Sequence, residues 1–558
     1  MDRDLASIQD ARDLLRRAHH AQLQFARTSQ ADTDRVVEAM ARAATDHARE
    51  LAELAVRETG MGRVESKTLK NLFVSERLHG AYRNARTCGV IREDLGRGII
   101  EVAEPVGVVA GIIPTTNPTS TAIFKVLIAV KGRNAIVLSP HPRAERCIQR
   151  SCEILARAAT AAGAPADLIL CMSAPTIEGT QELMRNALTS VVVATGGPGV
   201  VRAAYSSGKP AFGVGPGNPP VFVHRSANLP HAARCLVDSQ SFDYGTICSS
   251  EQSLVVERVI AEPFRAALRA ECVHFCDPRE APLLENLVQH GDGSFNTAIV
   301  GQAPTRLAEL AGFSVDARTR ILIAPGRGVG REFPLSREKL APILAWYEVD
   351  DWRAGCELCI ELIRYGGEGH TMGIYARDPE VVMAFGLEKP VARLIVNGPT
   401  TQGSVGYSTE LDPSMTLGCG AMGGNITSDN IGPRHLINVK RIAYPTATYF
   451  REVSQPCDAA DLAPVFGGGL PSALAGARAG EGVRQLLGHK TEQQIGLPAQ
   501  TSQADAASRG RALHPAVNVY GLEVAGAAAT SRELHARALY GARVPPRVEP
   551  RDPWRRGD

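Results

Sequence analysis

From residue 98 onward, short apolar runs alternate with amphipathic stretches, and this alternation limits the possible folds more than any other feature. The runs 107–113 and 135–138 are rich in β-branched residues, and residues 119–130 between them have helical spacing. The run 190–195 repeats the pattern, with helix-like sequence on both sides. Strands joined by crossover helices in this way predict an α/β fold with a doubly wound parallel sheet, which can hold a dinucleotide.

The length of 558 residues is enough for two or three domains. We expect a dinucleotide-binding domain over residues 1–229, which begins with helices and is completed by about 426–445. A second α/β domain is expected over 230–425, with the ligand in the cleft between the two. Residues 446–558 are rich in Ala, Gly, Pro and Arg, so we expect a partly disordered appendage there.

The charge balance argues against nucleic acid or a membrane surface as the partner. With 61 basic and 59 acidic residues the formal charge is +2, so small molecules are the expected partners. The sequence shows neither a signal-peptide pattern at its start nor an apolar run of roughly 18 residues. We therefore expect a cytoplasmic protein.

Twelve cysteines are scattered along the chain, at a density and spacing unlike those of a disulfide scaffold. Most are expected to be buried reduced thiols. Cys356 and Cys359 form a CxxC in a helix-like run, but no second pair of ligands accompanies them in the sequence. Because a zinc site needs four ligands, no metal is expected.

Three polar side chains are candidates for chemistry, and each also has a simple structural interpretation. Cys248 follows a small-residue turn, as a nucleophile would, although a cysteine in such a turn is more often structural. Asn117 follows an apolar run and could donate to an oxyanion or only shape a turn. His370 lies among glycines, where an imidazole can act as acid or base or be an idle loop side chain.

Two glycine-rich turns border apolar runs and could lie against a ligand. Gly196, Gly197 and Gly199 follow the run 190–195 and open a helix, which leaves backbone amides free near a passing ligand. Their spacing differs from the GxGxxG fingerprint. Gly215 lies in the second turn, which could also be only a tight connection.

Several long strings of sequence carry a family resemblance: Ala55-Val-Arg-Glu-Thr-Gly-Met-Gly62, Glu104-Pro-Val-Gly-Val108, Ile113-Pro-Thr-Thr-Asn-Pro-Thr-Ser-Thr-Ala-Ile-Phe-Lys125, Ser139-Pro-His-Pro-Arg143, Ala194-Thr-Gly-Gly-Pro-Gly199, Ala204-Tyr-Ser-Ser-Gly208, Leu417-Gly-Cys-Gly420 and Gly432-Pro-Arg-His-Leu-Ile-Asn438. In these strings the chain resembles the aldehyde dehydrogenase half of bifunctional aldehyde-alcohol dehydrogenases and the related stand-alone acylating enzymes. The likeness runs from about residue 10 to about residue 442.

The resemblance implies an aldehyde dehydrogenase fold, with a Rossmann-like dinucleotide-binding domain, an α/β catalytic domain and a small oligomerisation flap. It places Cys248 at the nucleophile, Asn117 at the oxyanion donor and Glu338 at the carboxylate that holds the nicotinamide ribose. The expected cofactor is NAD, with NADP as the alternative because Arg143 could meet a 2′-phosphate. The residues expected to bind it are Thr115, Ser139, His141, Gly196, Gly197, Gly199, Gly215 and Glu338.

Hydrolytic aldehyde dehydrogenases have a glutamate that activates water where this chain has Gly213. Without that base, we expect a thioester on Cys248 to persist until coenzyme A takes the acyl group, and His370 to help deprotonate the incoming thiol. The resemblance therefore implies an NAD-dependent acylating aldehyde dehydrogenase that forms a homodimer or a higher homo-oligomer. Acetaldehyde is the first candidate substrate, ahead of sulfoacetaldehyde and propionaldehyde.

Two other functions remain as alternatives. One is a hydrolytic aldehyde dehydrogenase, which Gly213 argues against. The other is a catalytically idle assembly protein, because residues 446–558 could dock to a partner or to a compartment shell. Docking of that kind would place the chain in the lumen of a microcompartment.

Overall fold

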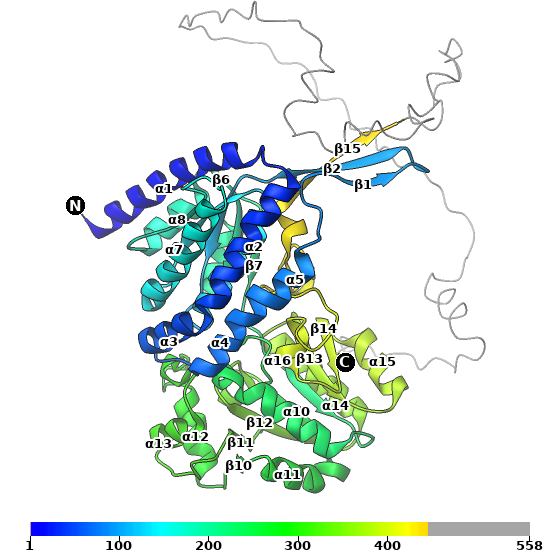
Figure 1. Cartoon of the computed structure of the whole chain (residues 1–558). Helices are drawn as coiled ribbons and strands as arrows, with labels where there is room; N and C mark the ends of the chain where they lie inside the picture. The colour runs from blue at the N-terminus through cyan, green and yellow to red at the C-terminus, as the bar shows by residue number, and fades with distance from the viewer. Residues whose placement is uncertain (1, 445–558) are drawn as a thin grey trace, which may run out of the picture. The chain divides into compact units, whose positions relative to one another are not determined.

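The structure, a computed structural model, describes residues 2–444, and the appendage expected at 446–558 lies outside them. Three β-sheets organise the described part of the chain (Figure 1). The first has five strands, the second seven and the third three. The α/β fold with parallel sheets that the sequence predicts is confirmed.

The five-stranded sheet is parallel and has the order β5-β4-β3-β6-β7. The chain places β3, β4 and β5 in one direction and then returns to place β6 on the other side of β3. The order therefore reverses between β3 and β6, which is where a doubly wound sheet binds its ligand. The strands are β3 Val108–Ile112, β4 Ala135–Ser139, β5 Ile169–Cys171, β6 Thr189–Thr195 and β7 Ala211–Val214.

Helices before and between these strands bury the apolar faces of the sheet. One of them, α6 (Pro118–Lys131), is buried at every position, because apolar residues occur on all of its sides. The helices of the N-terminal half are α1 Arg3–Phe25, α2 Gln30–Asp46, α3 Ala48–Thr59, α4 Val64–Leu72, α5 His79–Tyr82, α6, α7 Glu145–Ala161, α8 Ile177–Arg185 and α9 Pro198–Tyr205.

Local sequence signals explain where the N-terminal helices begin and end. The side chain of Ser29 accepts a hydrogen bond from the Asp32 amide at the start of α2. Helix α3 ends at Gly60, whose φ of 68° is the left-handed conformation that glycine adopts without a steric penalty. Beyond it, α4 continues through a π-helical turn at Phe73–Leu78 into α5. Helix α4 places Lys67 and Lys70 against Asp243.

The seven-stranded sheet is also parallel, with the order β10-β11-β12-β9-β8-β13-β14. Its strands are β8 Pro220–Val223, β9 Ser253–Glu257, β10 Val273–Phe275, β11 Ile321–Pro325, β12 Ile343–Val349, β13 Gly369–Tyr375 and β14 Val391–Val396. The accompanying helices are α10 Leu229–Ser241, α11 Ala261–Ala270, α12 Glu280–Val288, α13 Pro304–Ala311, α14 Trp352–Tyr365, α15 Pro379–Glu388 and α16 Thr400–Ser404.

The third sheet is antiparallel and joins strands from distant parts of the chain. It has the order β1-β2-β15, with β1 Gly89–Asp94, β2 Ile99–Pro105 and β15 Ile437–Ala443. Figure 1 shows it extending beyond the helices that surround the five-stranded sheet. It has the size of the expected flap, and its role in oligomerisation stays a prediction. Within residues 2–444, no helix is both long enough and apolar enough to span a membrane.

Candidate active site

Cys248 and His370 lie next to each other at the amino ends of strands in the seven-stranded sheet. Cys248 precedes β9, His370 is the second residue of β13, and their Sγ and Nε2 atoms are 3.2 Å apart. Gly217 precedes β8, the strand between those two. A side chain at 217 would overlap the carbonyl oxygen of Cys248 and press on the His370 ring. The close approach of the three strand ends therefore requires glycine at 217.

The structure corrects the interpretation of His370 as an idle loop side chain. The residue is in β13 and has no exposed surface. The glycines around it have another purpose, since Gly367 and Gly369 have φ values of +109° and +79°, which favour glycine. A side chain at Gly369 would also overlap the carbonyl oxygen of Cys419. These glycines let the chain turn tightly into the strand that presents the imidazole.

Burial determines the protonation of this pair. It raises the pKa of the Cys248 thiol to about 12, and the Glu338 carboxylate acts in the same direction once it is ionised. Burial also lowers the pKa of His370 to about 3, with a smaller contribution from the positive charge of Arg393. At neutral pH the resting site therefore holds a neutral thiol beside a neutral imidazole. A thiolate forms there only if nearby donors stabilise its charge.

Asn117 is held beside the turn that carries the candidate nucleophile. It caps the start of α6 with non-helical backbone angles. Its Nδ2 donates to the carbonyl of Thr246 at 3.0 Å, two residues before Cys248, and its Oδ1 accepts from Lys70. Nδ2 also donates to Oγ1 of Thr116 at 3.2 Å, so the side-chain amide is fixed at both ends, and an oxyanion bound by Asn117 would replace one of the two acceptors of Nδ2.

A buried charge cluster supports Asn117, and sequence reasoning missed it. Lys67 and Lys70 of α4 and Asp243, which is close to the nucleophile in the chain, are at most 4% exposed. Asp243 accepts from both lysines. Burial lowers the pKa of Lys70 to about 7. Two lysines three residues apart on an amphipathic helix resemble a solvated face, so the sequence contains no clear signal that they are buried.

Glu338 contacts the segment of chain that precedes β8. Its Oε1 accepts from the amide of Gly217 at 2.8 Å. Burial raises the pKa of this carboxyl to about 8. The carboxyl group therefore lies next to the strand ends that hold Cys248. Its contact with a nicotinamide ribose stays a prediction.

The residues expected to bind the dinucleotide lie at the carboxyl ends of strands in the five-stranded sheet. Thr115 follows β3, Ser139 ends β4, His141 follows β4, and Gly196 and its neighbours follow β6. Because β3 and β6 flank the point where strand order reverses, Thr115 and the glycines lie on the two sides of the expected crevice. Their placement suits a dinucleotide, and their contacts with one stay a prediction.

The glycines of this group differ in how much space surrounds them. A side chain at Gly197 or Gly199 would meet nothing within 4 Å, so the backbone at the start of α9 is open to a ligand. At Gly215 a side chain would make only an ordinary contact, at 3.8 Å from Val201. Gly196 is tighter, with Val200 at 3.3 Å. Open backbone amides at a helix start fit a bound pyrophosphate.

Gly213 lies in β7, where a tyrosine occupies the space beside it. A side chain at 213 would point at the Tyr205 ring, with its Cβ 3.0 Å from the nearest ring atom. The Tyr205 hydroxyl donates to the Gly213 carbonyl at 3.1 Å and accepts from the Gly213 amide at 3.2 Å. The Tyr205 side chain therefore occupies the space beside Gly213, and this position offers no carboxylate. A glutamate at 213 would fit only if Tyr205 moved.

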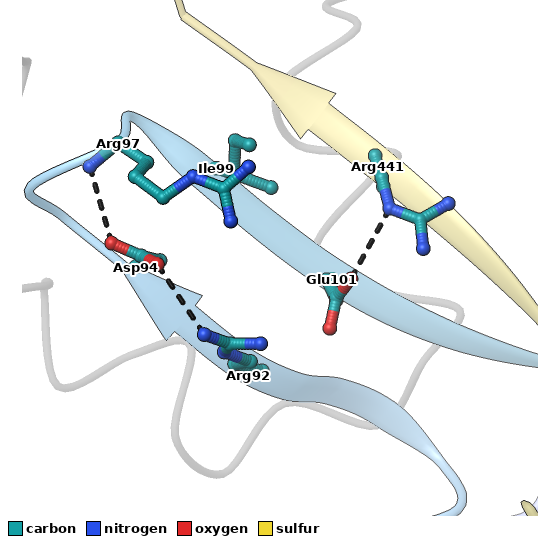
Figure 2. Close-up of a pocket in the computed structure, with 6 residues that line it drawn as sticks. All are labelled: Arg92, Asp94, Arg97, Ile99, Glu101 and Arg441. Carbon is teal, nitrogen blue, oxygen red and sulfur yellow. Dashed lines mark hydrogen bonds and ion pairs between the residues drawn. The ribbon is translucent and has the colours of Figure 1, made fainter. Parts of the chain in front are cut away.

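A depression of about 250 Å³ lies on the three-stranded sheet (Figure 2). Its lining residues are Arg92, Asp94, Arg97, Ile99, Glu101 and Arg441. The carboxylates are already paired, Asp94 with Arg92 at 3.4 Å and Glu101 with Arg441 at 3.2 Å. It contains no nucleophile, and the candidate active site is therefore the one around Cys248.

Comparison with known proteins identifies the class. Residues 3–281 match the aldehyde dehydrogenase family. The bifunctional aldehyde-alcohol dehydrogenase AdhE of Escherichia coli is 43% identical over 467 residues, covering 81% of this chain and 52% of that protein. The acylating sulfoacetaldehyde dehydrogenase of Cupriavidus necator is 40% identical over 443 residues, covering 78% of this chain and 88% of that protein. The chain belongs to the aldehyde dehydrogenase family, and it spans about half the length of the bifunctional relatives.

Solved structures place it more narrowly, among acylating enzymes. An acetylating aldehyde dehydrogenase from Geobacillus thermoglucosidasius is 48% identical with a TM-score of 0.80, covering 81% of this chain and 100% of that one. A propionaldehyde dehydrogenase from Rhodopseudomonas palustris, solved with bound CoA and an acylated cysteine, is 28% identical with a TM-score of 0.71, covering 78% and 96%. The resemblance to acylating aldehyde dehydrogenases is thus confirmed.

Proposed function

We propose that this chain is an acylating aldehyde dehydrogenase, which converts a short-chain aldehyde, coenzyme A and NAD to acyl-CoA and NADH in a reversible reaction. The observation that carries the proposal is the Cys248 thiol, 3.2 Å from His370, in a site where Gly213 supplies no base for water. Acetaldehyde is the first candidate substrate, since the acetylating relative is 48% identical. Sulfoacetaldehyde and propionaldehyde are the alternatives.

The residues of this chain divide the chemistry between them. Cys248 loses its proton to solvent and attacks the aldehyde carbon, and the resulting oxyanion is stabilised by Nδ2 of Asn117 and a backbone amide at the nucleophile. NAD supplies the hydride acceptor when it is bound. Cys248 then carries the acyl group as a thioester. The thiol of coenzyme A loses its proton and attacks this thioester, and the Cys248 sulfur leaves as a thiolate.

The residues that would hold NAD are those at the carboxyl ends of the five-stranded sheet. The open backbone at Gly197 and Gly199 supports a pyrophosphate there, and Glu338 would hold the nicotinamide ribose. NADP is the alternative dinucleotide. The proposal includes a homodimer or larger homo-oligomer and a cytoplasmic location. Docking of residues 446–558 to a compartment shell is the alternative to free cytoplasmic enzyme.

The test mixes purified protein with acetaldehyde and NAD, and follows NADH absorbance with and without coenzyme A. Turnover that requires coenzyme A, is lost in Cys248→Ala and persists in Cys272→Ala supports the proposal. Cys272 is a matched control because it is also only partly buried and lies outside the site. Steady turnover without coenzyme A, or no turnover with any of the three aldehydes, would overturn it.

A further inference from the structure

A buried arginine is connected to the Cys248–His370 pair through one hydroxyl group. Arg393 of β14 is 5% exposed, and its Nε donates a long hydrogen bond, 3.4 Å, to Oγ1 of Thr371. That Oγ1 is 3.0 Å from Nδ1 of His370, whose Nε2 is 3.2 Å from the Cys248 sulfur. Thr371 and Arg393 are direct partners in the β13–β14 ladder. The backbone register therefore places the arginine next to the hydroxyl.

The other hydrogen bonds of Arg393 hold its guanidinium in place. Nη1 donates to the carbonyl of Ser428 and to Oδ1 of Asn430, each at 3.1 Å, and Nη2 donates to the carbonyl of Gly418 at 2.6 Å. All of these acceptors are uncharged. The guanidinium is thus a fixed donor, and it brings a positive charge near the sulfur.

The direction of these hydrogen bonds determines which nitrogen of His370 carries a proton. A guanidinium can only donate, so the Thr371 oxygen accepts from Arg393. The Thr371 hydroxyl proton must then point elsewhere, and within the described chain its available acceptor is Nδ1 of His370. A neutral imidazole that accepts at Nδ1 carries its proton at Nε2. That N–H group points at the sulfur of Cys248.

We propose that Arg393 and Thr371 are positioning residues that hold His370 as the neutral, Nε2-protonated tautomer, so that His370 donates a hydrogen bond to the Cys248 sulfur. The inference rests on the proposed acyl-transfer function and gives the histidine a different role from the base expected from the sequence. The donor stabilises the thiolate when Cys248 attacks the aldehyde and again when its sulfur leaves the thioester. The proton stays on Nε2 throughout, and the coenzyme A thiol loses its proton to solvent.

The electrostatics of the site agree with a neutral donor. Burial and the charge of Arg393 hold the pKa of His370 at about 3, so the imidazole is a weak base at neutral pH. An N–H donor at Nε2 also acts against burial, which raises the pKa of the Cys248 thiol. The geometry therefore favours a histidine that stabilises the thiolate.

The test compares Thr371→Val, which removes the hydroxyl at nearly constant volume, with Thr371→Ser, which keeps it. The rate of Cys248 alkylation by iodoacetamide is measured on the full chain at a fixed pH of about 8, well below the pKa of the thiol, with the Cys248 peptide quantified by mass spectrometry. At this pH the rate follows the thiolate fraction, so we expect it to fall about tenfold in Thr371→Val and to stay unchanged in Thr371→Ser. An unchanged rate in a folded Thr371→Val protein would overturn the inference. If that variant does not fold, Thr371→Ala removes the same hydroxyl and gives the same comparison.

A double-mutant cycle separates positioning from simple structural support. If Thr371 acts only through the imidazole, Thr371→Val has no further effect on the alkylation rate in a His370→Ala background. A further loss of the same size in that background would contradict the inference. Alkylation needs neither aldehyde nor coenzyme A, so the two proposals fail separately. Absent turnover with a reduced alkylation rate in Thr371→Val would defeat only the acylating function, whereas normal turnover with an unchanged alkylation rate would defeat only the positioning role.

Discussion

The two parallel sheets contribute opposite ends to the active site and differ in how much space they leave there. The five-stranded sheet contributes the carboxyl ends of β3, β4 and β6, where Gly197 and Gly199 have open space beside them. The seven-stranded sheet contributes the amino ends of β8, β9 and β13, where Gly217 has none. The side where we propose that the cofactor binds is therefore built from accessible backbone, and we call it the open side. The side that carries the thiol is tightly packed, and we call it the packed side.

Because of this difference, we expect substitutions on the two sides to have different effects. A substitution on the open side changes how a ligand fits but leaves the fold intact, because nothing has to move to accommodate it. A substitution on the packed side displaces atoms of the reaction itself. Changes near Cys248 are therefore expected to affect turnover, and changes near the glycines that follow β6 are expected to affect cofactor affinity.

The largest effect is expected for Cys248→Ala. Loss of the nucleophile should lower coenzyme A-dependent turnover by about 10⁴-fold or more. NAD binding, measured by calorimetry, should be unchanged, because the open side of the site is untouched. Loss of NAD affinity in this variant, with its melting temperature unchanged, would show that the two sides are not separable.

Asn117→Ala should have the next largest effect. Removing an oxyanion donor costs about 10²- to 10³-fold in kcat, and we expect a loss of that size with little change in KM for the aldehyde. Lys70→Met should reproduce part of this loss, because Lys70 holds the Oδ1 of Asn117. Steady-state kinetics on both variants check the expectation. A Lys70→Met variant that loses more activity than Asn117→Ala would contradict the view that Lys70 acts by holding Asn117.

A matched pair of glycine substitutions tests the contrast in packing directly. Gly217→Ala should lower turnover by about tenfold or more and the melting temperature by several degrees, because its methyl group overlaps the Cys248 backbone. Gly197→Ala should leave the melting temperature unchanged and raise only the KM for NAD. Equal effects of the two substitutions on stability would remove the distinction between the packed and open sides.

The smallest effect concerns the pH dependence of stability. The pKa of His370 is about 3 in the folded chain against 6.5 ordinarily, so between these values the unfolded state binds one more proton. Through this group, stability falls by about 1.4 kcal/mol per pH unit as the pH decreases from about 6.5 toward 3, and is constant above about 6.5. His370→Gln should remove that contribution. Urea unfolding of both proteins at about pH 7.5 and about pH 5.5 checks it, and a difference between them that does not change with pH would contradict it.

The open side was largely predictable from the sequence, whereas the packed side was predictable only in part. Alternating apolar runs predicted the parallel strands, and the glycines after 190–195 lie where such a sheet binds its ligand. Cys248 and Asn117 were singled out by their local sequence, and the family resemblance supplied the roles predicted for them and for Glu338. Their mutual placement depends on strand ends that are far apart in the sequence, so no local pattern could predict it.

The missed residues are buried charges. Lys67, Lys70 and Asp243 come from two segments that meet only in the folded chain, and each would be expected at the surface from its neighbours in the sequence. Arg393 lies in a strand, where its partner Thr371 is determined by register and not by spacing. Pairing between distant segments offsets the cost of burying these charges, and such pairing is invisible in a single sequence.

The central claim is that Cys248 carries an acyl group that only coenzyme A removes efficiently. Incubation with acetaldehyde and NAD, without coenzyme A, followed by intact-protein and peptide mass spectrometry, tests it directly. We predict an increase of about 42 Da on the Cys248 peptide, which persists and disappears as acetyl-CoA forms when coenzyme A is added. No adduct on Cys248, or an adduct that is lost as acetate without coenzyme A, would contradict the claim.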